Sequence, residues 1–475
     1  MNDSTLLWAP SAWLPGGWRQ SVLLEAGGDG LWSRVVADVA DPPPRAQRLA
    51  GPALPGLVNA HSHAFQRAFA GLAERRELDV DDFWSWREQL YRVAHRIDPV
   101  NMQAVAAQLY IELLHVGYTH ICEFHYLQHR PDGSLYQDPL EMSWALARAA
   151  VEAGVHLTLL PVLYERAGLN QSALAPEQRR FRADADQVWA MQSAIGARQA
   201  AGVRAGLAIH SLRAASPESI ARVRELAERF SGPIHIHAAE QMQEVEQCVQ
   251  HLGARPIEWL ARYAALDARW QLVHATHASE KEVEMVARSG AGVVLCPTTE
   301  ANLGDGLTDL PAWLAAGVPI SIGSDSHVTR SWREELRWLE YGQRLAKRRR
   351  NIAAAPAAGV PSSAARLFER VVQGGAAAAG FTRWGLQVGA RADLLVTDMA
   401  EPSLLGVPQA MLLDVLVFSS PGRAWRDVMV AGHWQIKDHD HPLAGQLSAR
   451  FEQAMSQLWS EAYLRSVEPA VGERS

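Results

Sequence analysis

Eight apolar runs of strand length recur along this 475-residue chain, and helix-like segments separate them. Several of these segments begin with Pro or Ser, which are common at the first positions of helices. Strands that alternate with helices predict parallel pairing, because each helix returns the chain to the starting edge of the sheet. The eight runs span residues 53–60, 118–125, 156–164, 204–210, 233–238, 270–275, 291–296 and 318–323.

Eight such units over roughly 280 residues match an α/β fold of the TIM type, the (β/α)8 barrel. We expect this barrel over residues 56–383. The active site of such a barrel lies at the carboxyl ends of its strands. In this chain those ends are rich in His, Asp and Glu, which predicts an enzyme site there.

The two ends of the chain have a different pattern. Apolar runs at 21–25 and 31–39 flank a Gly-Gly-Asp-Gly turn, which predicts a hairpin. Short strand-like pieces return after residue 384. We therefore expect a small β-sandwich domain built from residues 1–55 and 384–441, followed by a helical tail over 442–475.

Composition excludes several classes of protein. The 45 basic and 52 acidic residues give a net charge of −7, which argues against nucleic acid as a partner. We find no apolar window long enough to span a membrane. The three cysteines are far apart in the sequence, so a disulfide framework and a cysteine-based zinc site are both disfavoured. We expect a cytoplasmic protein, in which local arginines would bind any acidic substrate.

Histidines at the strand ends predict a metal site. His61 and His63 are two residues apart at the end of an extended run, so both side chains project to one side. Alone the pair is a weak signal, because many such pairs are surface histidines. However, His237, His274 and Asp325 end the fifth, sixth and eighth strands. Imidazoles with one carboxylate suit a divalent ion such as zinc.

This arrangement resembles the amidohydrolase superfamily, whose barrel carries His-x-His after strand one, histidines after strands five and six, and Asp after strand eight. Binuclear members usually have a carboxylated lysine after strand four, where this chain has Ala-Ile-His-Ser at 208–211. The resemblance therefore implies a single metal ion.

Glu240 follows His237 by three residues, which is the His-x-x-Glu pattern typical of the deaminases in that superfamily. In those enzymes the Glu manages protons on the leaving nitrogen, and ammonia leaves only when that nitrogen is protonated. The alternative for Glu240 is a structural carboxylate at a helix N-terminus.

Six further segments are similar to one family within the superfamily, the formimidoylglutamate deiminases. That similarity implies hydrolysis of N-formimidoyl-L-glutamate to N-formyl-L-glutamate and ammonia, in histidine degradation. The segments are SHAFQR at 62–67, FWSWRE at 83–88, EFHY at 123–126, HSLRA at 210–214, TEANLGDG at 299–306 and IGSDSH at 322–327.

The resemblance also implies residue roles. One Zn²⁺ per chain would be bound by His61, His63, His237 and Asp325. Glu240, His274 and Asp325 would act on water and on the departing nitrogen. The substrate would be held by Gln66, Arg87, Tyr126, His210 and Arg213.

The residue types alone agree with the arginines, because a substrate with two carboxylates needs guanidinium partners. They leave other readings open, since Arg87 could lie on a helix surface and Tyr126 in the core. The second candidate function is an aminopurine or aminopyrimidine deaminase, which an aromatic pocket without paired arginines would favour. A non-enzymatic scaffold is disfavoured, because scaffold relatives typically lose ligand histidines. We expect a homodimer that acts on a small amidine with two carboxylates. We expect neither nucleic acid nor a membrane as a partner.

Overall fold

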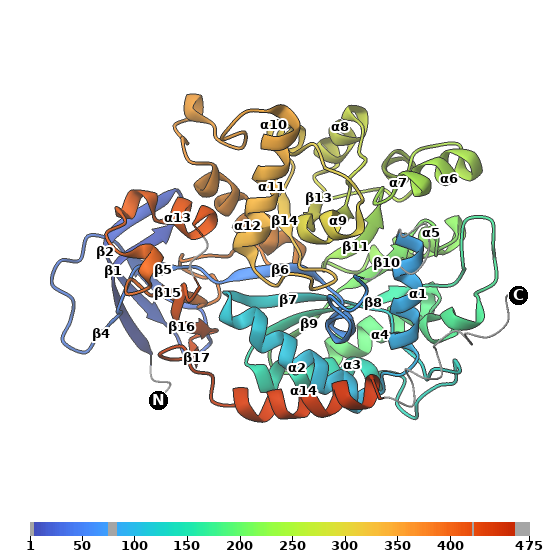
Figure 1. Ribbon diagram of the computed structural model, residues 1–475, viewed down its shortest axis with the longest axis horizontal. Coiled ribbons are helices and arrows are strands. Elements are labelled where there is room, and N and C mark those ends of the chain that lie inside the picture. The colour runs from blue at the N-terminus through green and yellow to red at the C-terminus, as the bar shows by residue number, and fades with distance from the viewer. Residues whose placement is uncertain (1–3, 75–82, 420–421, 461–475) are drawn as a thin grey trace, which may run out of the picture.

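The computed structural model describes residues 4–74, 83–419 and 422–460, and the side chains from residue 86 onward in the second range. The side chains of Phe83, Trp84 and Ser85 in the FWSWRE segment are therefore not described, and residues 461–475 of the predicted tail lie outside the described residues. Figure 1 shows a large barrel beside a smaller sheet to which both ends of the chain contribute.

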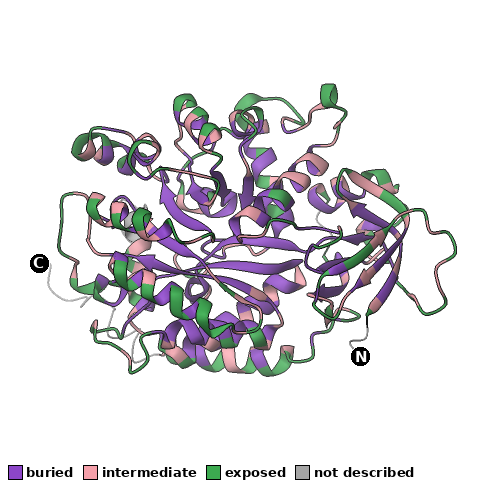
Figure 2. Cartoon of the chain, turned by 180° about the vertical axis from the view of Figure 1, so that it is seen from behind, coloured by how far each residue is buried: buried purple, intermediate pink, exposed green. Residues whose placement is uncertain are grey.

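Parallel strands form the barrel, and their order follows the chain from β6 to β14. In Figure 2 these strands are almost wholly buried behind the surrounding helices. This confirms the predicted (β/α)8 fold. The strands are β6 (Leu57–Ser62), β7 (Tyr118–His125), β8 (His156–Leu163), β10 (Leu207–Ser211), β11 (Ile234–Ala238), β12 (Trp270–His274), β13 (Gly292–Leu295) and β14 (Ile320–Ile322), with β9 (Val203–Ala205) paired to β8.

The barrel closes between its first and eighth strands. The N–H of Asp325 donates to the His61 carbonyl at 3.0 Å, and the N–H of His63 donates to the Asp325 carbonyl at 3.3 Å. Gly323 permits this approach, since a Cβ there would lie 2.6 Å from the Cβ of His61. Closure therefore places the ends of the first and eighth strands against each other.

Two predicted strands are wrong in extent. The run 53–60 divides at Pro55-Gly56, where β5 (Ala53–Leu54) joins the smaller sheet and β6 begins the barrel. The run 204–210 divides at Gly206, where a Cβ would lie 2.3 Å from the Leu160 side chain. In the first run both pieces are buried, so apolar patterning does not report the break, and in the second the piece before Gly206 is only half-buried to exposed.

Helices cover the barrel, and many begin as the sequence predicts. Ser216 and Ser279 accept hydrogen bonds from backbone N–H groups in the first turns of α5 and α8. The helices are α1 (Phe83–Ala94), α2 (Pro99–His115), α3 (Glu141–Ala153), α4 (Ala185–Arg198), α5 (Pro217–Ala227), α6 (Met242–Leu252), α7 (Pro256–Tyr263), α8 (Glu280–Ser289), α9 (Pro297–Leu303), α10 (Leu310–Ala315), α11 (Trp332–Lys347) and α12 (Ser363–Ala378).

Between the third and fourth predicted strands the sequence pattern predicts a helix over 176–200, and this segment also divides, into the 3₁₀ helix η2 (Pro176–Phe181) and α4. Between them Ala183 pairs with Tyr164 in an isolated bridge, and Asp184 then caps α4. This pairing ties η2 to the chain that leaves β8.

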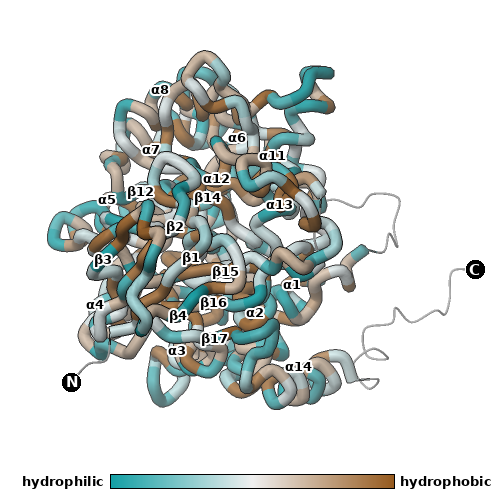
Figure 3. Tube along the Cα trace, turned by 90° about the vertical axis from the view of Figure 1, so that its left-hand side faces the viewer, coloured by the Kyte–Doolittle hydropathy of each residue, from teal (hydrophilic) through white to brown (hydrophobic). Residues whose placement is uncertain are grey.

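The smaller sheet surrounds a separate apolar core. An antiparallel bridge between Leu31 and Arg391 folds the sheet back on itself, which forms the predicted sandwich. The predicted hairpin is present, but the sequence pattern missed the first strand. Figure 3 looks onto this region, where hydrophobic residues lie along β15. Its order is β17 (His433–Ile436), β16 (Trp425–Val430), β15 (Leu394–Thr397), β5, β1 (Thr5–Leu14), β2 (Gly17–Ala26) and β3 (Trp32–Val36), with β4 (Gln47–Arg48) beside β1.

The limits proposed for the domains, at residues 55, 383 and 441, stay predictions. Near the C-terminus, α13 (Leu412–Phe418) contacts α11, and α14 (Ala444–Leu458) packs on α2. Among the described helices, none has both the length and the apolar character that crossing a membrane requires.

Candidate active site

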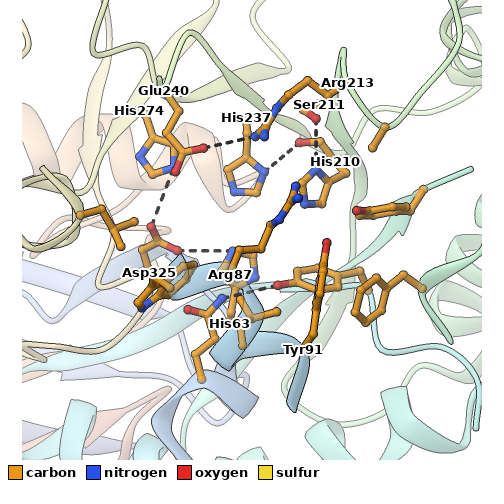
Figure 4. A pocket seen from close by; sticks show the side chains of 18 of the residues that line it. His63, Arg87, Tyr91, His210, Ser211, Arg213, His237, Glu240, His274 and Asp325 are labelled. Atoms are coloured by element: carbon orange, nitrogen blue, oxygen red, sulfur yellow. Dashed lines mark hydrogen bonds and ion pairs between the residues drawn. The ribbon is translucent and has the colours of Figure 1, made fainter. Parts of the chain in front are cut away.

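The strand ends bring the predicted metal ligands together. The Nε2 atoms of His61 and His237 lie 3.0 Å apart. Asp325 Oδ1 lies 3.4 Å from the Nε2 of His61 and 3.4 Å from the Nε2 of His63. All four side chains are at least 92% buried. Figure 4 shows His63, His237 and Asp325 facing one pocket with Glu240 and His274.

Backbone carbonyls fix the orientation of two of these imidazoles. The Nδ1 of His63 lies 2.9 Å from the Phe124 carbonyl, and the Nδ1 of His237 lies 2.8 Å from the His210 carbonyl. Because a carbonyl only accepts, Nδ1 carries the proton in both rings and Nε2 keeps its lone pair. Burial lowers the pKa of His61, His63 and His237, so all three are neutral. Converging lone pairs beside a carboxylate fit a divalent cation of the zinc class.

Glu240 and His274 form the neighbouring acid–base pair. The Nε2 of His274 lies 3.7 Å from Glu240 and 3.8 Å from Asp325, and its Nδ1 lies 3.4 Å from Glu300. Although burial opposes protonation, these carboxylates raise the pKa of His274 to about 10. Burial raises the pKa of Glu240 despite His274 and Arg213. The pair therefore retains a proton near neutral pH.

Two of these residues have left-handed backbone conformations, His274 with φ 69° and Asp325 with φ 45°. Such angles are uncommon outside glycine and persist where the surrounding structure enforces them. At Asp325 the enforcing contacts are the hydrogen bonds to His61 and His63 that close the barrel. The fold thus holds these side chains at angles that local sequence preference would not select.

The predicted substrate residues line the outer part of the same pocket. Gln66 is buried and donates to the Tyr126 hydroxyl at 3.5 Å. The His210 ring contacts the Tyr164 ring. Arg213 lies 3.5 Å from Glu240, which places one guanidinium beside the acid–base pair. The pocket is lined by His63, Gln66, Trp86, Arg87, Leu90, Tyr91, Tyr126, Tyr164, Ala167, Phe181, His210, Ser211, Arg213, Ala214, His237, Glu240, His274, Leu303 and Asp325.

Arg87 lines the pocket from α1, and its role with the substrate stays a prediction. Sequence reasoning missed Tyr91 and Tyr164, which also line the pocket. Helical spacing could have indicated Tyr91, because it lies four residues after Arg87 and so on the same face of α1. Tyr164 directly follows β8. A residue with a polar group at the carboxyl end of a barrel strand is itself a signal that it lines the pocket.

Comparison with known proteins gives consistent results. The model of the amidohydrolase family matches residues 53–435. A formimidoylglutamate deiminase of Pseudomonas aeruginosa is 45% identical over 454 residues, which cover 95% of this chain and 99% of that protein. The crystal structure of an amidohydrolase from Brucella melitensis has a TM-score of 0.89 and 40% identity, covering 96% of this chain and 99% of that one. An adenosine deaminase from Xanthomonas campestris with bound zinc shares the fold, with a TM-score of 0.78, 22% identity, and coverage of 96% and 98%.

Proposed function

The chain belongs to the amidohydrolase family, and from that membership we propose that it is a hydrolase that converts N-formimidoyl-L-glutamate and water to N-formyl-L-glutamate and ammonia. The observation that carries the proposal is one pocket with two different ends. The inner end holds the histidine–aspartate cluster and Glu240, and the outer end holds Arg87 and Arg213. An amidine with two carboxylates has groups that suit both ends.

His61, His63, His237 and Asp325 would hold one Zn²⁺. When bound, such an ion supplies a Lewis acid that lowers the pKa of a water molecule. The carbonyls of Phe124 and His210 keep the rings of His63 and His237 turned toward that position.

Glu240 carries the proton in the proposed reaction. It takes a proton from the attacking water, whose oxygen bonds to the formimidoyl carbon, and delivers it to the terminal nitrogen. Glu240 then takes the remaining proton from the added hydroxyl and delivers it to the same nitrogen, so the bond between that carbon and nitrogen breaks, ammonia leaves and the formyl C=O forms. His274 stays protonated between Glu240 and Asp325, where its charge favours negative charge that develops on the incoming oxygen.

The arginines orient the substrate. Arg213 lies beside Glu240, so it suits the α-carboxylate, which is close to the reacting carbon. Arg87 enters from α1 and suits the side-chain carboxylate. The rings of Tyr126 and His210 contact those of His63 and His237, and Gln66 donates to the Tyr126 hydroxyl. A nucleobase deaminase would need no paired guanidinium groups, so the pocket favours the dicarboxylate.

The test is ammonia release from N-formimidoyl-L-glutamate by metal-replete protein, with the formyl product identified by mass. Guanine and adenosine are assayed beside it. Turnover of the amidine alone supports the proposal, and turnover of a nucleobase alone rejects it.

The homodimer and the cytoplasmic location belong to the proposal as well. An exposed apolar stripe on α11, formed by Trp338, Tyr341 and Leu345, is one surface that a second copy could cover. Light scattering on the purified protein measures the assembly, and a monomer at micromolar concentration would reject the dimer.

A further inference from the structure

A buried glutamine joins two pocket tyrosines that have no assigned role. Gln178 lies on η2 and is 98% buried. Its Nε2 donates to the Tyr164 hydroxyl at 2.9 Å and to the Tyr91 hydroxyl at 3.2 Å. Both tyrosines line the pocket that contains Arg87 and Arg213.

The backbone fixes which end of the amide faces the tyrosines. Gln178 Oε1 accepts a hydrogen bond from the Ala175 N–H at 3.0 Å. A backbone N–H only donates, so the oxygen must lie on that side and the NH₂ group on the other. Both hydrogens of the NH₂ group are then used by Tyr91 and Tyr164.

This arrangement determines where the phenol hydrogens point. Each hydroxyl oxygen already accepts a hydrogen bond from Gln178, so its own hydrogen needs a different acceptor. Tyr91 and Tyr164 are neighbours, but a bond between them uses only one of the two hydrogens. Among the residues that the structure describes, at least one O–H therefore remains available to an acceptor in the pocket.

Charge and position indicate the kind of acceptor. Figure 4 shows the side chains of Tyr91 and Arg87 extending into the same part of the pocket. Burial raises the pKa of the Tyr164 hydroxyl well above its ordinary value, and Tyr91 adds to this effect, while the charges of Arg87 and Arg213 oppose it. The hydroxyl thus stays protonated and lies in a field that attracts anions.

We propose that Gln178 is a positioning residue that turns a hydroxyl hydrogen of Tyr91 or Tyr164 into the pocket, where it binds the same substrate carboxylate as Arg87. This inference rests on the proposed function, since it takes the occupant to be a dicarboxylate. The tyrosine hydroxyl adds a neutral hydrogen-bond donor to the site. Guanidinium groups alone would bind many different anions. A hydrogen bond to a charged acceptor makes binding roughly tenfold tighter or more.

Gln178→Glu reverses the hydrogen bonding without changing the size of the side chain. One carboxylate oxygen still accepts from Ala175, but the other now accepts from the hydroxyls and turns their hydrogens away from the pocket. The matched control is Gln187→Glu. Gln187 is exposed, and its Oε1 accepts from the Asp184 N–H at 3.0 Å in the same capping role, with a backbone partner and not a tyrosine.

The experiment measures glutarate binding to the metal-replete protein by calorimetry, which requires no turnover. We expect Gln178→Glu and the double variant Tyr91→Phe/Tyr164→Phe each to weaken binding about tenfold or more, and Gln187→Glu to leave it unchanged. Combining Gln178→Glu with the two Phe substitutions should cost little beyond the double variant. Deiminase assays should show the loss mainly in KM, with kcat retained.

Each outcome of this experiment supports or overturns the inference. Wild-type glutarate affinity in Tyr91→Phe/Tyr164→Phe overturns the inference, and this variant does not depend on a buried charge being tolerated. Fully additive losses also overturn it, because they assign the effect of Gln178→Glu to charge repulsion. Absence of glutarate binding to the wild type overturns it as well. If glutarate binding depends on these residues but formimidoylglutamate is not hydrolysed, the proposed function fails while the carboxylate site stands.

Discussion

The inner and outer ends of the pocket are built differently. The inner end consists of side chains at the ends of β6, β11, β12 and β14, held by backbone hydrogen bonds and left-handed turns. The outer end comes mainly from segments outside the strands, namely α1, η2, the 3₁₀ helix after β6 (Ala64–Ala68) and the residues at or after the ends of β7, β8 and β10. Metal chemistry thus lies on the rigid barrel, and substrate selection lies on parts that can vary without disturbing it. If this division is real, substitutions at the two ends should affect different measurable quantities.

The largest effect is expected at the metal cluster. Asp325→Ala removes the carboxylate that contacts both His61 and His63. Metal analysis should fall from about one zinc-class ion per chain toward zero, and activity should fall with it. Circular dichroism should remain that of a folded barrel, because the backbone hydrogen bonds at the seam do not use this side chain. Two tightly bound ions per active wild-type chain would refute the single-metal proposal.

Glu240→Gln should give the next largest effect. Glutamine keeps the size of the side chain but cannot carry a proton. We expect kcat to fall roughly 100-fold or more, the scale of general acid–base catalysis, while the metal content stays at the wild-type level. Steady-state kinetics and metal analysis measure the two quantities. Loss of the metal would make Glu240 a ligand, and a near-normal kcat would make it a structural residue at a helix N-terminus.

The two arginines of the outer end sharpen the comparison. Arg213 also contacts Glu240 of the inner end, whereas Arg87 comes from α1. Replacing either with Met should lower kcat/KM by a factor that corresponds to about 2 kcal/mol of lost transition-state stabilisation, the scale of a lost charge-assisted hydrogen bond. Arg87→Met should act mainly through KM. Arg213→Met should lower kcat as well, since Arg213 lies 3.5 Å from Glu240. Identical kinetic signatures for the two variants would remove the distinction between the ends, and wild-type kinetics in both would remove the arginines from the site.

The sequence predicted the inner end better than the outer end, and the reason is physical. The carboxyl ends of all strands in a parallel barrel lie at the same face. The strand pattern alone therefore brings His61, His237 and Asp325 together. The outer residues depend on how η2 and α1 pack against the barrel. The division of the segment 176–200, which places Gln178 against Tyr91 and Tyr164, arises from a bridge between Tyr164 and Ala183. Neither periodicity nor helix-start signals report a contact of that kind.

The smallest effect is expected at Glu300, a buried residue that supports the inner end without touching the proposed substrate position. Its carboxylate lies 3.4 Å from His274 Nδ1 and accepts from the Cys296 N–H at 2.9 Å. Glu300→Gln keeps an acceptor for the backbone but removes the charge that holds His274 protonated and oriented. We expect kcat to fall about tenfold, with metal content and KM close to wild type, as is common when an outer hydrogen-bond partner is changed. A change confined to KM would place Glu300 with the outer end of the pocket, and that result would contradict the division between metal chemistry on the strands and selection on the segments outside them.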